Sequence, residues 1–164
     1  MEYICAGYVS GTHGLKGELK IISDIEHKEL IFKSGEFLYF KINDSYEMFQ
    51  INSHRIHKNF ELITLKNYES IESVQNFTGK HVYFKRDKRF KNIVFLDELI
   101  GMKVYSKTNE FLGTVTTIMK TKANPVLKIE GETKILVPYV DYFIEDINLK
   151  TKEIIIKVIE GMIE

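Results

Sequence analysis

Apolar and polar residues alternate over much of the chain, and this period of two is the pattern of β-strands with one buried face. The alternation is clear over residues 80–85 and 152–158. Residues 2–10 are rich in Tyr, Ile, Val and Ala, which predicts a first strand mostly buried on both faces. Pattern and β-branched or aromatic content predict further strands at 17–23, 36–42, 46–57, 60–66, 102–107, 111–120, 126–131 and 134–140.

Three short segments favour helix instead. Residues 26–33 can form two turns that end before Gly35, and residues 70–77 place apolar side chains at spacings of three. Residues 97–100 can form one more turn. The sequence therefore predicts an all-β protein with a few short helices, and the six strands of its first half fit a small closed barrel.

A cationic run divides the chain of 164 residues into two parts. Five of the seven residues from Lys85 to Lys91 are Lys or Arg, which is typical of an exposed linker. We therefore expect a first domain over residues 1–87, a basic linker over 88–96 and a second domain over 97–164.

The composition, with 44% hydrophobic and 28% charged residues, predicts a folded protein. Its formal net charge of zero argues against a protein whose affinity rests on broad neutralisation of phosphates. The single cysteine, Cys5, lies in an apolar run and is expected to be a buried, inert thiol in a reducing compartment. Neither a signal peptide nor a long apolar run is evident, so we expect a soluble, cytoplasmic protein with no membrane contact.

Three glycines recur at every third position in the segment from Gly11 to Leu19. Glycine reaches positive φ at little cost, so Gly11, Gly14 and Gly17 predict a sharply shaped loop. The side chains between them, those of His13, Leu15 and Lys16, would then point outward as in a binding loop. The spacing does not match a phosphate-binding loop. A hairpin in which the glycines serve only the turn is the alternative.

Titratable residues are too scattered to predict a catalytic or metal site. His54 and His57 are three apart in an expected strand and so lie on opposite faces. The adjacent carboxylates of Asp97-Glu98 and Glu145-Asp146 suit surface or capping positions. We therefore expect no enzymatic activity, no metal and no cofactor.

Residues 11–19, which read G-T-H-G-L-K-G-E-L, resemble the opening signature of the RimM family of bacterial ribosome maturation factors. Stretches that resemble later motifs of that family follow in the same order. They are Leu30-Ile31-Phe32, Leu99-Ile100-Gly101, Thr121-Lys122-Ala123-Asn124, Leu136-Val137-Pro138-Tyr139-Val140 and Glu160-Gly161. The resemblance spans nearly the whole chain.

The resemblance implies an N-terminal six-stranded barrel similar to those of translation factors and a C-terminal barrel of the PRC type. It further implies a non-enzymatic, monomeric factor that binds small-subunit ribosomal protein nineteen. Such a factor assists assembly of the head of the immature small ribosomal subunit and processing of 16S rRNA. A PRC-barrel module with a different protein or RNA partner, and an RNA-modifying enzyme, are the alternatives.

The resemblance also implies sites. Val94 and Phe95 fall where the family often has two tyrosines, so Phe95 is expected to be an exposed partner anchor, with Tyr139 also binding the partner. The glycine loop, with His13, Leu15 and Lys16, would face the particle. A domain-junction plug is the alternative for Val94 and Phe95.

Auxiliary contacts with rRNA are expected from five cations of the linker region, with Phe90 as a stacking group. The alternative is a solvated linker. These cations are Lys85, Arg86, Lys88, Arg89 and Lys91.

Overall fold

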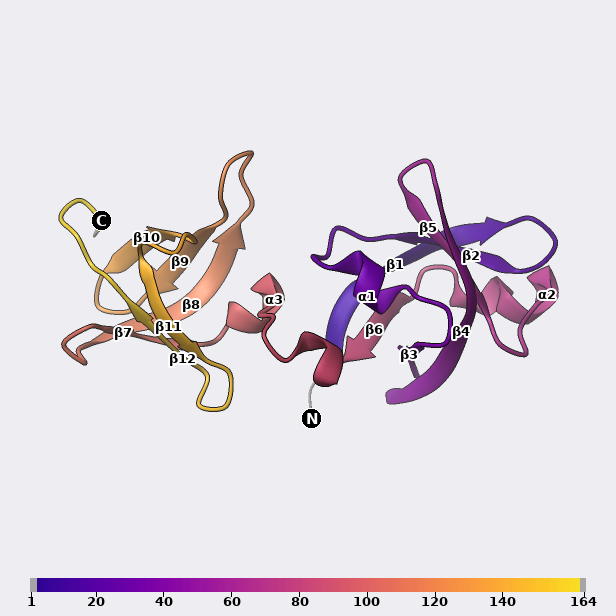
Figure 1. The fold of residues 1–164 in the computed structure, drawn as a ribbon, viewed down its shortest axis with the longest axis horizontal. Coiled ribbons are helices and arrows are strands. Elements are labelled where there is room, and N and C mark those ends of the chain that lie inside the picture. The colour runs from indigo at the N-terminus through magenta and orange to yellow at the C-terminus, as the bar shows by residue number, and fades with distance from the viewer. Residues whose placement is uncertain (1–2, 163–164) are drawn as a thin grey trace. The chain divides into compact units, whose positions relative to one another are not determined.

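The computed structural model describes residues 3–162, which fold as two compact units that meet in the sequence between Lys91 and Asn92 (Figure 1). Each unit is built on six strands, and the few helices are short. The all-β fold class expected from the sequence is confirmed. The boundary between the units lies after Lys91, inside the segment expected to be a linker.

The first unit is a closed antiparallel barrel with strand order β1-β2-β5-β4-β3-β6, in which β6 pairs with β1. Closure leaves no unpaired sheet edge. Its strands are β1 (Tyr3–His13), β2 (Glu18–Ile22), β3 (Phe37–Ile42), β4 (Ser45–His57), β5 (Phe60–Leu65) and β6 (His81–Lys85).

Alternate residues of most barrel strands fill the barrel interior. Strand β1 follows this rule, because Ile4 and Ala6 are buried whereas Cys5 is only partly buried. The expectation that this strand is buried on both faces, with a buried thiol, is therefore wrong. Strand β5 is the one with two covered faces, since all residues from Glu61 to Leu65 are buried.

Short helices lie in the connections between strands of the first unit. The expected two-turn helix at 26–33 is a single turn, α1 (Lys28–Ile31), and it buries Ile31 together with the following Phe32. The other short helices of the chain are α2 (Ile71–Val74), η1 (Gln75–Phe77), η2 (Lys88–Phe90) and α3 (Leu96–Leu99).

The second unit is a six-stranded sheet with the order β10-β9-β8-β7-β12-β11, and its β12–β7 pair is parallel. Buried apolar side chains from β7 to β12, among them Val104, Ile129 and Ile154, form one core. Its strands are β7 (Lys103–Ser106), β8 (Phe111–Met119), β9 (Val126–Glu130), β10 (Lys134–Pro138), β11 (Ile144–Asn148) and β12 (Glu153–Ile156). Among the described residues, no helix is long and apolar enough to cross a membrane.

Candidate functional site

The glycine segment forms the hairpin that joins β1 to β2. His13 and Glu18 are its last strand pair, and the four residues between them form the loop. Gly14 and Gly17 have φ of 73° and 77°, the left-handed region that favours glycine. Gly11 lies within β1, opposite Lys20, and has no positive φ, so its expected role in shaping the loop is wrong.

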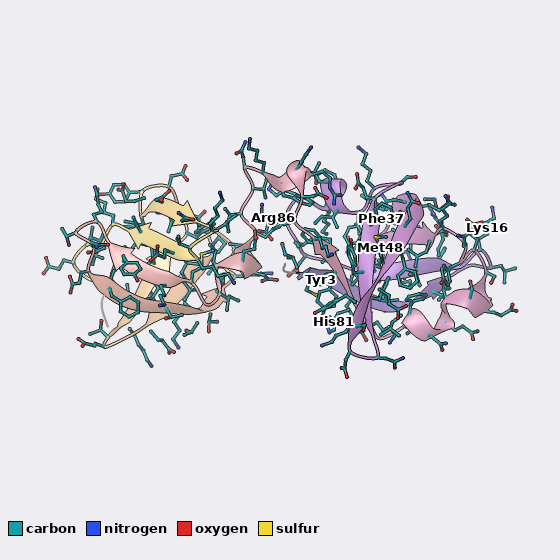
Figure 2. The ribbon with its side chains drawn as sticks, turned by 90° about the horizontal axis from the view of Figure 1, so that it is seen from below. Tyr3, Lys16, Phe37, Met48, His81 and Arg86 are labelled. Atoms are coloured by element: carbon teal, nitrogen blue, oxygen red, sulfur yellow. The ribbon has the colours of Figure 1, made fainter. Side chains whose placement is uncertain are left out.

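The loop presents two side chains to solvent. Leu15 is 84% exposed, and Lys16 is exposed at the end of the hairpin (Figure 2). Single exposed apolar residues are ordinary on protein surfaces, but an aliphatic side chain exposed to this degree on a tight loop is free to enter a partner's pocket. The loop geometry therefore suits a binding role.

Gly17 holds the loop against α2. A Cβ atom at this position would lie 2.7 Å from the carbonyl oxygen of Ser70, the residue that caps α2. Real Cβ atoms do not approach a backbone oxygen that closely, so only glycine fits. Spacing in the sequence suggested a glycine for the turn, but the contact with a segment 53 residues away is a property of the fold.

An ion pair stands at the base of the loop. Arg55 of β4 donates two hydrogen bonds of 2.9 Å to the carboxylate of Glu18. The rings of His13 and His57 lie 5.2 Å apart beside them. The hydrogen bonds from Arg55, together with the charges of Arg55, His13 and His57, lower the pKa of Glu18 against the opposing effect of burial.

This lowered pKa predicts a pH-dependent contribution to stability. The Glu18 carboxylate contributes most above its unfolded pKa, near 4.5, and the contribution is lost as the pH falls through the lower folded value. Glu18→Gln should therefore reduce the free energy of unfolding at pH 7 by about 1 kcal/mol, a modest effect because Arg55 is half exposed. Denaturant titrations at pH 7 and pH 3 would measure it. Glu69→Gln, at an exposed position, is the control. The prediction would be contradicted if the difference in unfolding free energy between Glu18→Gln and the wild type were as large at pH 3 as at pH 7.

The basic segment after β6 is partly structural. Arg89 is only 20% exposed, pairs with Asp87 at 2.8 Å and with Glu36 at 3.0 Å, and donates to the carbonyl of Leu30 at 2.6 Å. The hydrogen bonds from Arg89 lower the pKa of Asp87. Phe90 is fully buried against Phe84, so the expectation that Phe90 stacks on RNA bases is wrong.

The other cations of this segment differ in their surroundings. Lys85 lies over the rings of Tyr3 and Tyr39, and Arg86 donates to the carbonyl of Phe90 at 2.6 Å. Lys88 and Lys91 are exposed. Residues 88–90 form a 3-10 turn held to the first unit by Arg89, so a simple solvated linker does not describe them.

The expected anchor before the second sheet is buried. Phe95 is 0% exposed, and its backbone N–H donates to the carboxylate of Glu98 at 2.9 Å. The expectation that Phe95 is exposed is therefore wrong, and its side chain is part of the protein interior. Val94 and Tyr139 are partly buried and pack against the core of the second unit.

Tyr142, which the sequence analysis did not select, is the more exposed aromatic residue near Tyr139. It is 60% exposed, packs edge-on against Phe143 with the ring centroids 4.9 Å apart, and has the Lys157 ammonium 4.0 Å from its ring centre. The feature of the sequence that could have identified Tyr142 is its position in a turn between two strands. A rigid aromatic ring beside a cation is a common composition for a protein-binding anchor.

A pocket of about 670 Å³ opens beside α1, with His54 and Glu61 among its lining residues. Their side chains are 2.9 Å apart, so the buried Glu61 carboxylate is already partnered. Within residues 3–162, no cluster of three or more His, Cys, Asp or Glu side chains could hold a metal ion. The features described above are surfaces suited to binding.

Comparison with known proteins covers both units. The RimM N-terminal domain model matches residues 4–89, and the RimM PRC barrel domain model matches residues 96–162. Ribosome maturation factor RimM of Ligilactobacillus salivarius is 36% identical over 168 residues, with 99% of each chain covered. The protein of that name from Staphylococcus epidermidis is 31% identical over 162 residues, covering 96% of this chain and 97% of its own.

A solved structure is also similar along its length. The crystal structure of a 16S ribosomal RNA processing protein RimM from Pseudomonas aeruginosa superposes with a TM-score of 0.48 at 19% identity, covering 96% of this chain and 98% of its own. The two domain models occur here in order and together span most of the chain, and the curated relatives match end to end. The chain therefore belongs to the RimM family.

Proposed function

We propose that the protein is a non-enzymatic ribosome maturation factor that binds small-subunit ribosomal protein nineteen. In this role it assists assembly of the head of the immature small subunit and processing of 16S rRNA, and it acts as a monomer in the cytoplasm. The observation that carries the proposal is the match of both RimM domains, in order, with relatives named ribosome maturation factor.

The two units supply different surfaces for this function. The second unit offers an aromatic surface for the ribosomal protein, in which exposed Tyr142 and partly buried Tyr139 replace Phe95 as candidate contacts. The first unit offers the stiff glycine loop with Leu15 and Lys16. Exposed Lys88 and Lys91 add salt-sensitive attraction to rRNA without sequence specificity.

A maturation factor must bind the immature particle more tightly than the mature one, because only differential affinity shifts an assembly equilibrium. Sedimentation of the protein with immature and mature small subunits tests this directly. Measurement of binding to purified ribosomal protein nineteen tests whether it is the partner. Equal binding to both particles would contradict the maturation role. Capture of unrelated proteins without small-subunit components would favour a PRC-barrel module with another partner.

Tyr142→Ala should weaken binding to ribosomal protein nineteen by about tenfold. Truncation of an aromatic anchor removes contacts worth about 1–2 kcal/mol or more, and about 1.4 kcal/mol corresponds to tenfold. Isothermal titration calorimetry with the full chain would measure the change. Because the ring is 60% exposed, thermal stability should be nearly unchanged.

The matched control is Phe111→Ala, which removes another exposed aromatic ring, 54% exposed, from the same unit. It should bind the ribosomal protein as the wild type does. Equal loss in both variants would mean that any exposed ring contributes. Unchanged binding by Tyr142→Ala would remove Tyr142 from the proposed surface.

A further inference from the structure

Four strands of the first barrel carry a cluster of tyrosines on their outward face. Strand register brings together residues far apart in the sequence, because Tyr39 pairs with Tyr83 across β3 and β6. Tyr3 pairs with Lys85, and Tyr46 pairs with Lys41, in the neighbouring rows. We call these six residues the tyrosine face; Tyr3 and the adjacent Met48 are labelled in Figure 2.

The rings of the tyrosine face touch one another and form a continuous aromatic surface. Tyr3 and Tyr46 are stacked with centroids 3.8 Å apart and planes inclined by 10°. Tyr39 lies edge-on to Tyr3 at 5.1 Å, and Tyr83 lies edge-on to Tyr46 at 5.1 Å. The four side chains are partly exposed, whereas the alternate residues of β3 and β6, such as Phe40 and Phe84, fill the barrel interior.

The charge of the tyrosine face has one sign. The Lys85 ammonium lies 4.9 Å and 5.1 Å from the ring centres of Tyr3 and Tyr39, and the Lys41 ammonium lies 5.8 Å from that of Tyr46. Alternation along the strands assigns the odd residues of 3–5, 37–41 and 81–85 and the even residues of 46–50 to this face. None of these described positions is Asp or Glu. A polyanion therefore meets Lys41 and Lys85 at these positions, while the exposed Asp44 of the β3–β4 turn lines a hollow together with Lys41 and Tyr83 at the border of the face.

Aromatic rings interleaved with lysines match the chemistry of unpaired nucleic acid. Bases stack on aromatic side chains, while phosphates are attracted to ammonium groups. A duplex offers its phosphates but keeps its bases stacked inside, so it could use only the lysines. Burial raises the pKa of Tyr83, so its hydroxyl stays protonated and able to donate a hydrogen bond at neutral pH.

We propose that the tyrosine face binds single-stranded RNA, with bases stacking on its tyrosine rings and phosphates contacting Lys41 and Lys85. The choice of RNA over DNA as the natural ligand rests on the proposed function in ribosome maturation. The single-stranded specificity rests on the tyrosine face alone. This surface is distinct from the basic segment at 86–91, whose Phe90 is buried.

Fluorescence anisotropy with a labelled oligouridine of about ten nucleotides tests the proposal, with an RNA duplex of equal length as competitor. The first variant pair is Met48→Glu and Met48→Gln. Met48 is 58% exposed and pairs with Tyr39, so either replacement should fold. The two side chains have similar size and differ in charge, so their comparison isolates repulsion of phosphate by a carboxylate.

Met48→Glu should weaken oligouridine binding about fivefold to tenfold at low salt, and Met48→Gln less than twofold. The second variant pair is Tyr46→Ala, expected to lose about tenfold, and Tyr46→Phe, expected to bind as the wild type because the ring is kept. Lys41→Gln should reduce the slope of log affinity against log salt by about 0.7. Phe111→Ala, an exposed ring in the other unit, should have no effect.

Equal affinity for the duplex and the oligouridine would overturn the proposal, because stacking would then contribute nothing. Equal affinities of Met48→Glu and Met48→Gln would overturn it too. Loss of binding to ribosomal protein nineteen by Tyr46→Ala, with oligouridine binding intact, would assign the face to a protein partner. The proposed function is tested separately through Tyr142 and the particles, so either hypothesis can fail while the other stands.

Discussion

Phe95→Ala should lower the free energy of unfolding by about 3–5 kcal/mol, the usual cost of removing a buried phenyl ring and leaving a cavity. The side chain is 0% exposed, so no partner reaches it in the folded protein. Thermal and denaturant unfolding of the full chain would measure the loss, with coincidence of probes used to test whether the transition is two-state. Binding to ribosomal protein nineteen should fall only as far as the folded fraction falls.

Phe95→Leu is the matched control, because a large apolar side chain refills most of the cavity and should recover much of the lost stability. Phe95→Tyr would place a hydroxyl in a site without solvent, so it should be less stable than the wild type. An alanine variant that melts normally but loses partner binding would restore Phe95 as an anchor. That result would require a conformation in which the ring is exposed.

Gly17→Ala should lower the free energy of unfolding by about 2–5 kcal/mol. A positive φ of 77° costs an alanine about 1–2 kcal/mol, and the 2.7 Å approach to the Ser70 carbonyl adds overpacking of about 1–3 kcal/mol. The obstructing atom is backbone, so relief requires the hairpin to move away from α2. Unfolding experiments measure the stability, and binding to immature subunits should weaken because the loop is displaced.

Gly14→Ala separates the two causes. Gly14 has a similar φ of 73°, but nothing lies within 4 Å of its added Cβ atom. It should therefore show only the conformational cost, about 1–2 kcal/mol. Equal destabilisation at both positions would mean that the contact between Gly17 and Ser70 is unimportant.

The sequence predicted strands where residues alternate or where β-branched and aromatic residues are frequent. Strand β11 was missed because Ile144 and Ile147 are three apart, a spacing that does not read as a strand. The structure shows why, since the register with β12 shifts between Ile144 and Asp146. The extra residue, Glu145, restores both isoleucines to contact with the second core.

The candidate sites were less predictable because they depend on tertiary placement. The positive φ of Gly14 follows from local sequence, and the exposure of Leu15 follows from its place between glycines. The burial of Phe95 is set by tertiary packing, which the local sequence does not indicate. The tyrosine face could not be predicted from the sequence for the same reason, because only the pairing of strands brings Tyr3 beside Tyr46.

The position of β12 in the second sheet affects when the second unit can fold during synthesis. This strand, Glu153–Ile156, lies between β7 and β11 rather than at an edge. The first barrel has all of its strands once Lys85 has been synthesised, whereas the second sheet lacks a central strand until Ile156. At 5–20 residues per second, the intervening residues take roughly 4–14 s to translate. Once Ser106 has been added, β7 lacks its neighbour β12 until Ile156 is synthesised, so one edge of β7 stays unpaired and open to other chains.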